Sequence, residues 1–570
     1  MAARSAIVST RTILTNDVTI FAAKKVITMN PARPYATHLA VRDGRVLSVG
    51  SLDEVRQWGG RVDETLADKV LMPGFVEGHC HAFEGALWSC PYVGFHDRRD
   101  PNGKRWPGLK SIDAVVERLR EEDRRLGDDP RPIFAWGFDP MHFGDRRADR
   151  SDFDRVSKTR SMAILHASIH LLNVNSALMK EAGITRALNI HGIVKSEDGE
   201  PTGELREMAA MYLAYKVLGS HSPRLDATAT PEPVWRFARL AQLNGVTTAT
   251  DLLNELGPAT VANYRALTVG EDFPVRVVPA LNPTSRSTDD GIKLLKELVA
   301  LGNDKLHFGI VKIITDGSMQ GFTARIKWPH YYENGRNGLW NVAPQDLRRL
   351  AEAYHRAGFQ LHIHVNGDEA SEAAIEVMEG VLGAAWRPDH RHTLQHCQMI
   401  DTAQIRRMKA LGLCANLFAN HIYYYGDHHY SRLLGPDRAN RVDPAATVVR
   451  HGVPFAIHSD APVTPLSPLF TASCAVNRRT TSGRVLGEEE RISVDEALRA
   501  ITLGAAYTLK LDHLVGSLEV GKFADVAILE QDPYGVPPQD LGAVKVWGTL
   551  LGGKLFRGAT PAAEMAELTA

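Results

Sequence analysis

Short apolar runs alternate with amphipathic segments along the central part of the chain. Eight of these runs have the length of a strand, and several are separated by segments with the charged faces and terminal glycines of ordinary helices. Strands that alternate with helices indicate βα units and a parallel sheet. We therefore predict an α/β fold, a distorted TIM (βα)8 barrel, whose strands are VLMPGFVEGH, GVTTATDL, PVRVVPAL, FGIVKIITDG, GFQLHIHVNGD, RHTLQHC, LGLCANL and PFAIHSD.

The two ends of the chain have the pattern of short strands and tight turns that is typical of a small β-domain. Asp43-Gly44 and Gly552-Gly553, each flanked by strand-like residues, are signals of two-residue hairpin turns. We expect residues 1–72 and 512–570 to form one composite β-sandwich domain beside a barrel of residues 73–511.

One interval, residues 82–233, is too long for a simple βα step between the first and second predicted strands. Its charged stretch DAVVERLREEDRRLGDDPR is typical of a solvated helix. We expect this large insertion after strand 1 to be a lid or substrate-recognition subdomain over the barrel mouth.

Charge and composition narrow the class of partner. The 66 Lys and Arg residues nearly match the 67 Asp and Glu residues, for a formal net charge of −1, so no overall field draws the protein to nucleic acid or acidic membranes. No apolar stretch approaches the roughly 18 residues of a membrane span, and we expect no secretory signal. Five scattered cysteines fit a reducing compartment. We expect a cytoplasmic protein that acts on a small molecule, with a homodimer as the candidate assembly.

Histidines close the first predicted barrel strand, in the sequence His79-Cys80-His81. Residues i and i+2 of a strand point the same way, so one metal ion can take both imidazoles. Active sites of βα barrels form at the carboxyl ends of the strands. Later strands carry residues that suit a metal site at or near these ends, namely Lys312, His364, His396 and Asp460. The joint pattern predicts a metal site at the barrel mouth.

Each of these residues also has a structural interpretation. A lone histidine is more often packed than metal-bound, Lys312 beside an acid such as Asp316 suits an ion pair, and Asp460 suits a turn cap. The occurrence of all of them in barrel order outweighs these interpretations. Cys80 and Cys397 are predicted to be structural, because strand neighbours of a ligand point away from it.

Two further histidines compete with the chosen ones. His362 shares a strand face with His364, and His392 lies four residues before His396. We prefer His364 and His396 because they are nearer the carboxyl ends of their strands.

A lysine amine is a poor metal ligand unless carbon dioxide converts it to a carbamate, whose two oxygens can bridge two metals. Two ions roughly 3.5–4 Å apart would share a hydroxide, lower its pKa towards neutrality and polarise a substrate carbonyl. Asp460 would accept the proton of this hydroxide and pass it to the departing nitrogen.

The order of these motifs resembles the amidohydrolase superfamily and, within it, family 3, which includes N-substituted formamide deformylases. Glu77 stands where aspartate is commoner in that family. The matching blocks are PGFVEGHCH, GIVKSEDGEPTGELRE, VKIITDGS, HVNGDEA, RHTLQHCQ, HSDAPV and GSLEVGKFADVAIL. The resemblance implies the barrel with its β-sandwich, and a binuclear site with Lys312 as a carboxylated bridging lysine. Its metal ligands are then His79, His81, Lys312, His364, His396 and Asp460.

The insertion carries WGFDPMHF and HASIHLLNVNS, which are similar to blocks of the same family. They make Asp139 and His170 candidate pocket residues, with His170 a candidate donor to the substrate carbonyl. Trp88, Phe418 and Tyr424 are candidates for the lining of an apolar or aromatic substrate pocket. Core packing is the competing interpretation for each.

We therefore expect a metal-dependent amidohydrolase that uses a metal-activated hydroxide to cleave an amide or N-formyl C–N bond of a small, apolar or aromatic substrate. The expected cofactors are divalent ions, with zinc first among them and two per chain. One alternative is a mononuclear deaminase of the same superfamily, which Lys312 and the non-acidic Gly367 disfavour. Another is a non-catalytic assembly protein, like the relatives of dihydropyrimidinase that have lost their metals, but this chain keeps its ligands.

Overall fold

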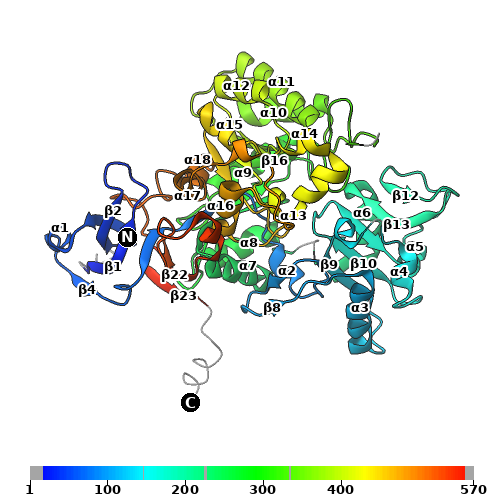
Figure 1. The fold of residues 1–570 in the computed structure, drawn as a ribbon, viewed down its shortest axis with the longest axis horizontal. Coiled ribbons are helices and arrows are strands. Elements are labelled where there is room, and N and C mark those ends of the chain that lie inside the picture. Colours follow the sequence, from blue (N-terminus) through cyan, green and yellow to red (C-terminus); the bar gives the residue numbers. More distant parts are fainter. Residues whose placement is uncertain (1–16, 145–146, 224–226, 333–334, 559–570) are drawn as a thin grey trace, which may run out of the picture.

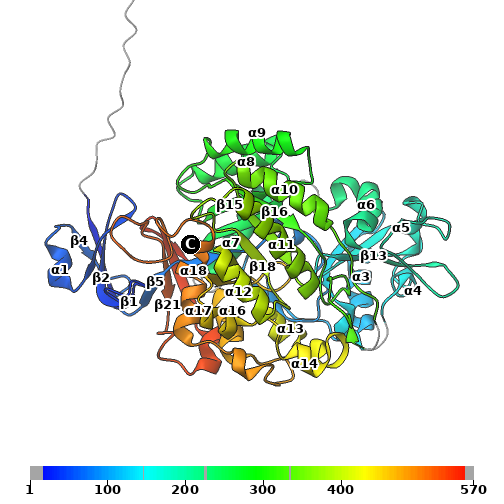
Figure 2. The same ribbon diagram turned by 90° about the horizontal axis from the view of Figure 1, so that it is seen from above.

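The computed structural model of the protein describes residues 17–144, 147–223, 227–332 and 335–558. Three parts follow one another along the long axis of the molecule, and both views agree on their order (Figures 1 and 2). A sheet built from the chain ends lies at one end, a parallel sheet with its helices lies in the middle, and a smaller sheet from the insertion lies at the other end.

Eight parallel strands form the central sheet, in the spatial order β20-β19-β18-β17-β16-β15-β14-β6. Strands that follow one another in this chain segment are neighbours in the sheet, as βα units require. The strands are β6 Phe75–Glu77, β14 Val246–Asn254, β15 Arg276–Leu281, β16 Ile310–Ile314, β17 Gln360–Val365, β18 Thr393–His396, β19 Cys414–Leu417 and β20 Phe455–Ile457. The parallel α/β fold predicted from the sequence is confirmed.

The first predicted strand is divided into two at Gly74. Residues Val70–Pro73 are strand β5 of the end sheet, and only Phe75–Glu77 joins the central sheet as β6. The hydrogen bonds change partner at this point, because Gly74 N donates to Asp525 O and Phe75 N donates to Gly245 O, both at 2.9 Å. A Cβ on Gly74 would lie 2.0 Å from the Thr247 hydroxyl, so the crossing point requires glycine.

Side-chain alternation explains how a central strand carries both core and site residues. On β17, Leu361, Ile363 and Val365 belong to the main hydrophobic core, together with residues of the flanking helices. His362 and His364 point the other way, into the curl of the sheet.

Helix α12 has the ends that the sequence predicts for the helices around the central sheet. Asp401 caps α12 in a capping box with Gln404, and Gly412 ends it with a φ of 70°. The helices are α7 Pro231–Leu243, α8 Pro258–Thr268, α9 Thr288–Val299, α10 Pro344–Arg356, α11 Asp368–Ala384, α12 Thr402–Leu411, α13 Asn420–His428, α14 Gly435–Ala439, α15 Ala445–Arg450, α16 Pro468–Asn477, α17 Val494–Ala500 and α18 Leu503–Thr508.

The two edge strands of the central sheet are linked by a side chain. Among the described strands, no backbone ladder joins β6 to β20. Instead, Ser459 N and Oγ both donate to the Glu77 carboxylate at 3.1 Å. Burial raises the pKa of Glu77 to about 8, and the Ser459 hydrogen bonds oppose this rise. The sheet is therefore curled with its edges tied by Glu77, and a fully closed barrel stays an expectation.

Strands from both chain ends meet in one sheet, in the order β23-β22-β21-β5-β1-β2-β3, with β4 paired to β1. The turns Asp43-Gly44 and Gly552-Gly553 join β2 to β3 and β22 to β23, and all four residues have positive φ, as type I′ hairpins require. Both hairpin predictions are confirmed, while the two-layer sandwich stays a prediction. The strands are β1 Thr19–Ile27, β2 Tyr35–Arg42, β3 Arg45–Gly50, β4 Arg61–Asp63, β5 Val70–Pro73, β21 Val526–Leu529, β22 Val546–Leu551 and β23 Lys554–Arg557.

Residues between β6 and β14 build a sheet of their own, in the order β12-β13-β11-β10-β9. The charged stretch predicted as a solvated helix is α3, and it buries Val115, Val116 and Leu119, so one of its faces packs in a core. The insertion contains α2 Glu84–Leu87, α3 Ile112–Leu126, β9 Ile133–Phe138, α4 Arg150–Asp154, β10 Met162–His166, β11 Leu171–Val174, α5 Ser176–Glu181, β12 Ile193–Lys195, β13 Pro201–Arg206 and α6 Glu207–Leu218. No helix of the described residues is long and apolar enough to cross a membrane.

Candidate active site

Two histidines that follow β6 converge on one carboxylate that follows β20. His79 Nε2 lies 3.3 Å and His81 Nε2 lies 3.2 Å from Asp460 Oδ1. All three residues are buried, and their ligand atoms lie close enough together to hold one metal ion. The strand-one pair and the aspartate of the HSDAPV motif, which are 379 or more positions apart, therefore meet at one point as the barrel order predicts.

Hydrogen bonds on the far side of each ring determine which nitrogen faces Asp460. His79 Nδ1 donates to Gln395 Oε1 at 2.7 Å, and His81 Nδ1 donates to Leu252 O at 2.8 Å. A proton on Nδ1 leaves the Nε2 lone pair of each neutral ring directed at the candidate metal position. Metal-ligating histidines commonly have this second hydrogen bond, which fixes the tautomer and the ring orientation.

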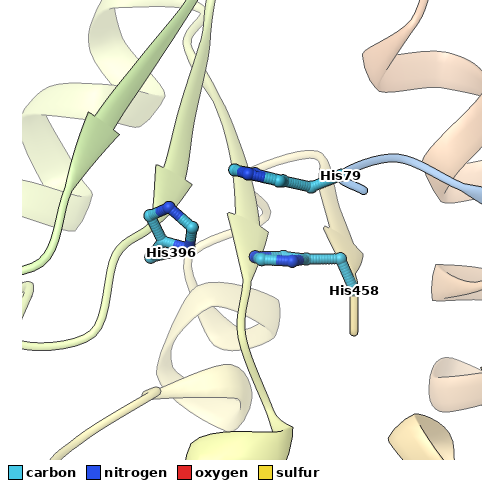
Figure 3. Close-up of side chains that lie close together, drawn as sticks. All are labelled: His79, His396 and His458. Atoms are coloured by element: carbon cyan, nitrogen blue, oxygen red, sulfur yellow. The ribbon is translucent and has the colours of Figure 1, made fainter. Parts of the chain in front are cut away.

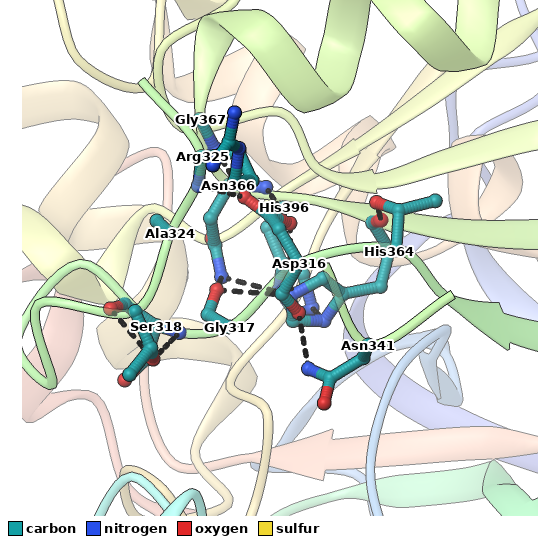
Figure 4. Close-up of polar contacts among 12 residues, drawn as sticks. Asp316, Gly317, Ser318, Ala324, Arg325, Asn341, His364, Asn366, Gly367 and His396 are labelled. Atoms are coloured by element: carbon teal, nitrogen blue, oxygen red, sulfur yellow. Dashed lines mark hydrogen bonds and ion pairs between the residues drawn. The ribbon is translucent and has the colours of Figure 1, made fainter. Parts of the chain in front are cut away.

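A second pair of histidines lies beside the first. His364 Nδ1 and His396 Nε2, from β17 and β18, are 3.0 Å apart. On its other side, His364 Nε2 lies 3.2 Å from Gly317 O and 3.1 Å from Asn366 Nδ2 (Figure 4). His396 Nδ1 is 3.7 Å from Asp460 Oδ2, which connects the two pairs.

Lys312 of β16 is buried at the same place, at 1% exposure, and its Nζ has no hydrogen-bond partner in the part of the chain that the structure describes. Burial lowers the pKa of Lys312 to about 7, although the charge of Asp460 opposes this. No ion pair with Asp316 is found. The Asp316 carboxylate instead accepts from the backbone N–H groups of Asn366, Gly367 and Arg325, at 2.9–3.1 Å.

His458 was not among the predicted residues, although it belongs to the same HSDAPV motif as Asp460. Its ring stacks on His79 at 4.5 Å between centroids with 12° between the planes (Figure 3). The ligand nitrogens of His79, His396 and His458 nevertheless lie close enough together to hold one metal ion, so His458 is a further candidate ligand beside the predicted ones. It packs between His79 and Phe418, 4.9 Å from the latter ring, and supports the His79 ring.

A cavity of about 220 Å³ opens beside these residues. All six predicted metal ligands line it. The rest of its lining contains aliphatic, sulfur-containing and polar side chains, but no Phe, Tyr or Trp among the described residues. These residues are Ile169, His170, Glu207, Met208, Met211, Leu253, Asn282, Thr284, Ile313, Ile314, Asn341 and Val342. Several of these residues come from the insertion, so the insertion closes one side of the site.

The insertion also supplies a paired histidine and glutamate at the cavity wall. His170 Nδ1 donates to Glu207 Oε2 at 2.8 Å, and Glu207 N donates to His170 O at 2.8 Å. Burial alone would raise the pKa of Glu207, but the His170 charge and its hydrogen bonds lower it overall. Asn341 Nδ2 also donates to Glu207 Oε2, at 3.1 Å. Glu207, which was not predicted, begins α6 with a φ of 61°, an uncommon backbone conformation for a residue other than glycine.

The four predicted pocket residues Trp88, Asp139, Phe418 and Tyr424 lie outside the lining of this cavity. Trp88 packs edge-on against Trp136 at 5.0 Å. Asp139 and Tyr424 line a separate, much smaller cavity, and Phe418 is buried behind His458. Their roles as substrate contacts stay predictions.

The competing histidines and the cysteines lie away from the cavity. His362 Nδ1 is 2.7 Å from Gln395 Nε2, and His392 is hydrogen-bonded to His355 and to Leu361 N. Cys80 and Cys397 are buried in the main core, as predicted for structural residues.

The chain is similar to several known proteins. Among relatives, the protein LONG AFTER FAR-RED 3 of Arabidopsis thaliana is 27% identical over 93% of this chain and 90% of its own length. The N-substituted formamide deformylase of Arthrobacter pascens is 25% identical over 93% of this chain and 96% of its own. The structure of an uncharacterized metal-dependent hydrolase from Pyrococcus horikoshii OT3 shares the fold, with a TM-score of 0.70 and 20% identity, over 92% of this chain and 99% of that one. Residues 65–556 match the amidohydrolase family, and this protein therefore belongs to that family of hydrolases.

Proposed function

We propose that this protein is a metal-dependent amidohydrolase that cleaves the C–N bond of an amide or N-formyl group in a small molecule. The observation that carries the proposal is the convergence of His79 Nε2 and His81 Nε2 on Asp460 Oδ1 at a cavity wall, with both Nδ1 atoms already held by acceptors. Membership of the amidohydrolase family supports hydrolysis, and similarity to an N-substituted formamide deformylase supports the C–N bond.

The donor set fits two divalent ions, and we propose zinc because imidazole and carboxylate groups are among its usual ligands. His79, His81 and Asp460 would hold one ion, and His364 and His396 would hold the other. Asp460 Oδ1 and His396 Nδ1 are buried without a hydrogen-bond partner among the described residues, which fits a site completed by an ion. Bound ions would supply Lewis acidity towards the carbonyl and make water nucleophilic at neutral pH.

Lys312 suits the bridging role because its amine is poised for carboxylation. A buried amine with a pKa of about 7 is partly unprotonated at neutral pH. The neutral amine can attack carbon dioxide, form a C–N bond and lose one proton, which gives a carbamate with two oxygens. We propose that this carbamate joins the two halves of the site.

The chain's own groups can handle the protons of amide hydrolysis. Asp460 would take a proton from the attacking water and pass it to the departing nitrogen, because an amine anion is a poor leaving group. His170 would donate a hydrogen bond to the carbonyl oxygen as negative charge develops there. Glu207, ionised and bonded to His170 Nδ1, orients the ring and favours its protonated form.

The test is to measure metal content and hydrolysis of N-formyl and N-acyl amines together. We expect two ions per wild-type chain, and we expect Asp460→Asn to lose about 10³-fold in kcat. Asp437→Asn, at a side chain that is 97% exposed, is the matched control and should keep full activity. Full activity in Asp460→Asn, or in chelated protein, would contradict the proposal. One ion per chain, unaffected by Lys312→Ala, would favour the mononuclear deaminase instead.

A further inference from the structure

A second pocket adjoins the cavity of the candidate active site. It has a volume of about 360 Å³, and Thr284, Asn341 and Val342 line both the pocket and the cavity. Thr284 follows β15, and Asn341 and Val342 lie between β16 and α10. Both segments follow the carboxyl ends of their strands, where the active sites of βα folds form. A substrate whose amide lies at the candidate metal ligands can therefore extend into this pocket, which we call the outer pocket.

Two arginines line the outer pocket, and one of them has no counter-ion among the described residues. Arg286 is half-buried, and its Nη2 donates to Glu255 O. Its Nε is buried without a hydrogen-bond partner in the described parts of the chain, and no carboxylate of those parts forms an ion pair with it. A partly desolvated guanidinium without a nearby anion is unfavourable. Arg286 therefore has unused capacity to bind an anion.

Arg349 presents a second guanidinium to the same pocket. Its Nη1 donates to Thr288 Oγ1 at 2.9 Å, and its Nη2 lies 3.6 Å from Asp346 Oδ1, where both side chains are more than half exposed. Burial raises the pKa of Tyr354, and the charges of Arg286 and Arg349 both oppose this rise, so the two guanidinium groups lie near one phenol. Asp346 is the one carboxylate among the described residues of the lining, which leaves the pocket with one net positive charge.

The net charge of the outer pocket selects among anions. A carboxylate carries one negative charge, and its two oxygens match the paired N–H donors of a guanidinium. A phosphate monoester carries about −1.5 to −2 charges at neutral pH, which exceeds the net charge of the lining. A carboxylate therefore matches this pocket better than a phosphate does.

We infer that the substrates carry a carboxylate at the far end of a chain, and that Arg286 and Arg349 bind this carboxylate in the outer pocket while an uncharged amide lies at the candidate metal ligands. The nature of the bond cleaved rests on the proposed function. The carboxylate site rests separately on the two arginines and on the continuity of the two pockets. Binding of a remote group in this way holds the amide in a fixed orientation for attack.

Matched carboxylate and carboxamide compounds test the role of the charge. N-Acetyl-ε-aminocaproate has its carboxylate on the amine side of the amide, and the monomethylamide of adipate has it on the acyl side. Each is compared with its analogue in which a carboxamide replaces the carboxylate, and the release of acetate or methylamine by metal-loaded wild-type protein is measured. We expect kcat/KM to be at least about tenfold higher for one carboxylate compound than for its analogue. An advantage below about threefold in both pairs would overturn the inference.

Substitution of the arginines tests the physical cause. Arg286→Met and Arg349→Met keep a long, flexible side chain without the charge, and we expect each to reduce the advantage of the carboxylate at least about fivefold. Arg348→Met, on the same helix as Arg349 but outside the lining, is the matched control and should keep the wild-type ratio. An advantage that persists in both Arg286→Met and Arg349→Met would show that the carboxylate is recognised elsewhere, such as at the metal centre, and would overturn the inference.

Binding separates failure of the inference from failure of the proposed function. If the wild-type protein hydrolyses none of these compounds, each can be titrated calorimetrically against it as an intact ligand. Binding of a carboxylate compound at least about tenfold more tightly than its analogue, lost in Arg286→Met and kept in Arg348→Met, would support the inference while the proposed hydrolysis fails. Equal binding within each pair, or binding of no compound, would overturn it.

Discussion

His79 donates a hydrogen bond from Nδ1 to Gln395 Oε1 over 2.7 Å, and this contact turns Nε2 of the same ring towards Asp460. Asn416 Nδ2 also donates to Gln395 Oε1, at 2.9 Å, and Gln395 Nε2 lies 2.7 Å from His362 Nδ1. A candidate ligand that follows β6 is thus oriented by residues of β17, β18 and β19, on the far side of the curled sheet.

Gln395→Met should weaken metal binding while the protein stays folded. Methionine fills a similar volume but cannot accept from His79 Nδ1, so the ring loses its fixed tautomer and orientation. Loss of such an outer partner typically costs 10–100-fold in metal affinity, roughly the range expected here. Competition with a chelator measures the affinity, and Gln539→Met at an exposed position is the control. An unchanged affinity in Gln395→Met would show that this hydrogen bond does not orient the ligand.

Glu207→Gln should lower kcat by about 10²-fold without removing metal. Glutamine can still accept from His170 Nδ1, but it lacks the negative charge that favours the protonated imidazole. Metal content and kcat are measured on the same preparation, with Glu200→Gln, a more exposed glutamate of the insertion, as the control. Loss of metal together with activity would instead indicate that Glu207 maintains the metal centre.

The sequence identifies these residues as candidate ligands because their signal is local. Alternating side chains along β17 place His364 on the inner face, and the His79-Cys80-His81 pattern needs no distant information. The neighbours Gln395 and His396 show the limit of this reasoning, since strict alternation places them on opposite faces. His396 has a φ of 70°, which bends the chain at the end of β18, and both side chains reach the site.

The pairing of His170 with Glu207 depends on the register of two strands of the insertion. Leu171 of β11 pairs with Arg206 of β13, which places the residues on either side of this pair next to each other. No local pattern specifies that register. The position of Tyr424 depends on tertiary packing for a related reason, because Tyr424 lies on α13 and packs against His96 and Phe470 rather than in the lining of the cavity.

Arg276→Ala should destabilise the junction between the central sheet and the end sheet by roughly 3–5 kcal/mol. Arg276 Nε and Nη2 donate to the Asp525 carboxylate at 2.6 and 3.0 Å, and both side chains are at most 3% exposed. Removal of the guanidinium leaves a buried carboxylate without its partner. The midpoint of urea unfolding measures the loss. As the control, Lys554→Ala breaks an exposed ion pair with Asp272 and should leave the urea midpoint nearly unchanged. An equal fall of the midpoint in both variants would contradict this explanation.

The protein should lose stability as the pH falls below about 6.5, and His142 should contribute to that loss. Burial lowers the pKa of His142 to about 4 and that of its neighbour His96 to about 3. The unfolded chain takes up protons near pH 6.5, so it binds more protons than the folded chain between that pH and about 4. The free energy of unfolding should therefore fall by up to about 1.4 kcal/mol per pH unit for each such histidine.

The contribution of His142 to the loss of stability at low pH can be measured with the variant His142→Phe. His142 stacks on Phe95, at 4.9 Å between centroids with 22° between the planes, so phenylalanine can keep the packing and remove the titration. Urea midpoints measured from pH 8 to pH 5 should fall less steeply for His142→Phe than for the wild type. His513→Gln, at an exposed position, should follow the wild-type curve. Both proteins keep the same metal ligands, so acid-induced loss of metal affects both curves alike. Coincident curves for His142→Phe and the wild type would show that His142 is protonated to the same extent in the folded and unfolded chain.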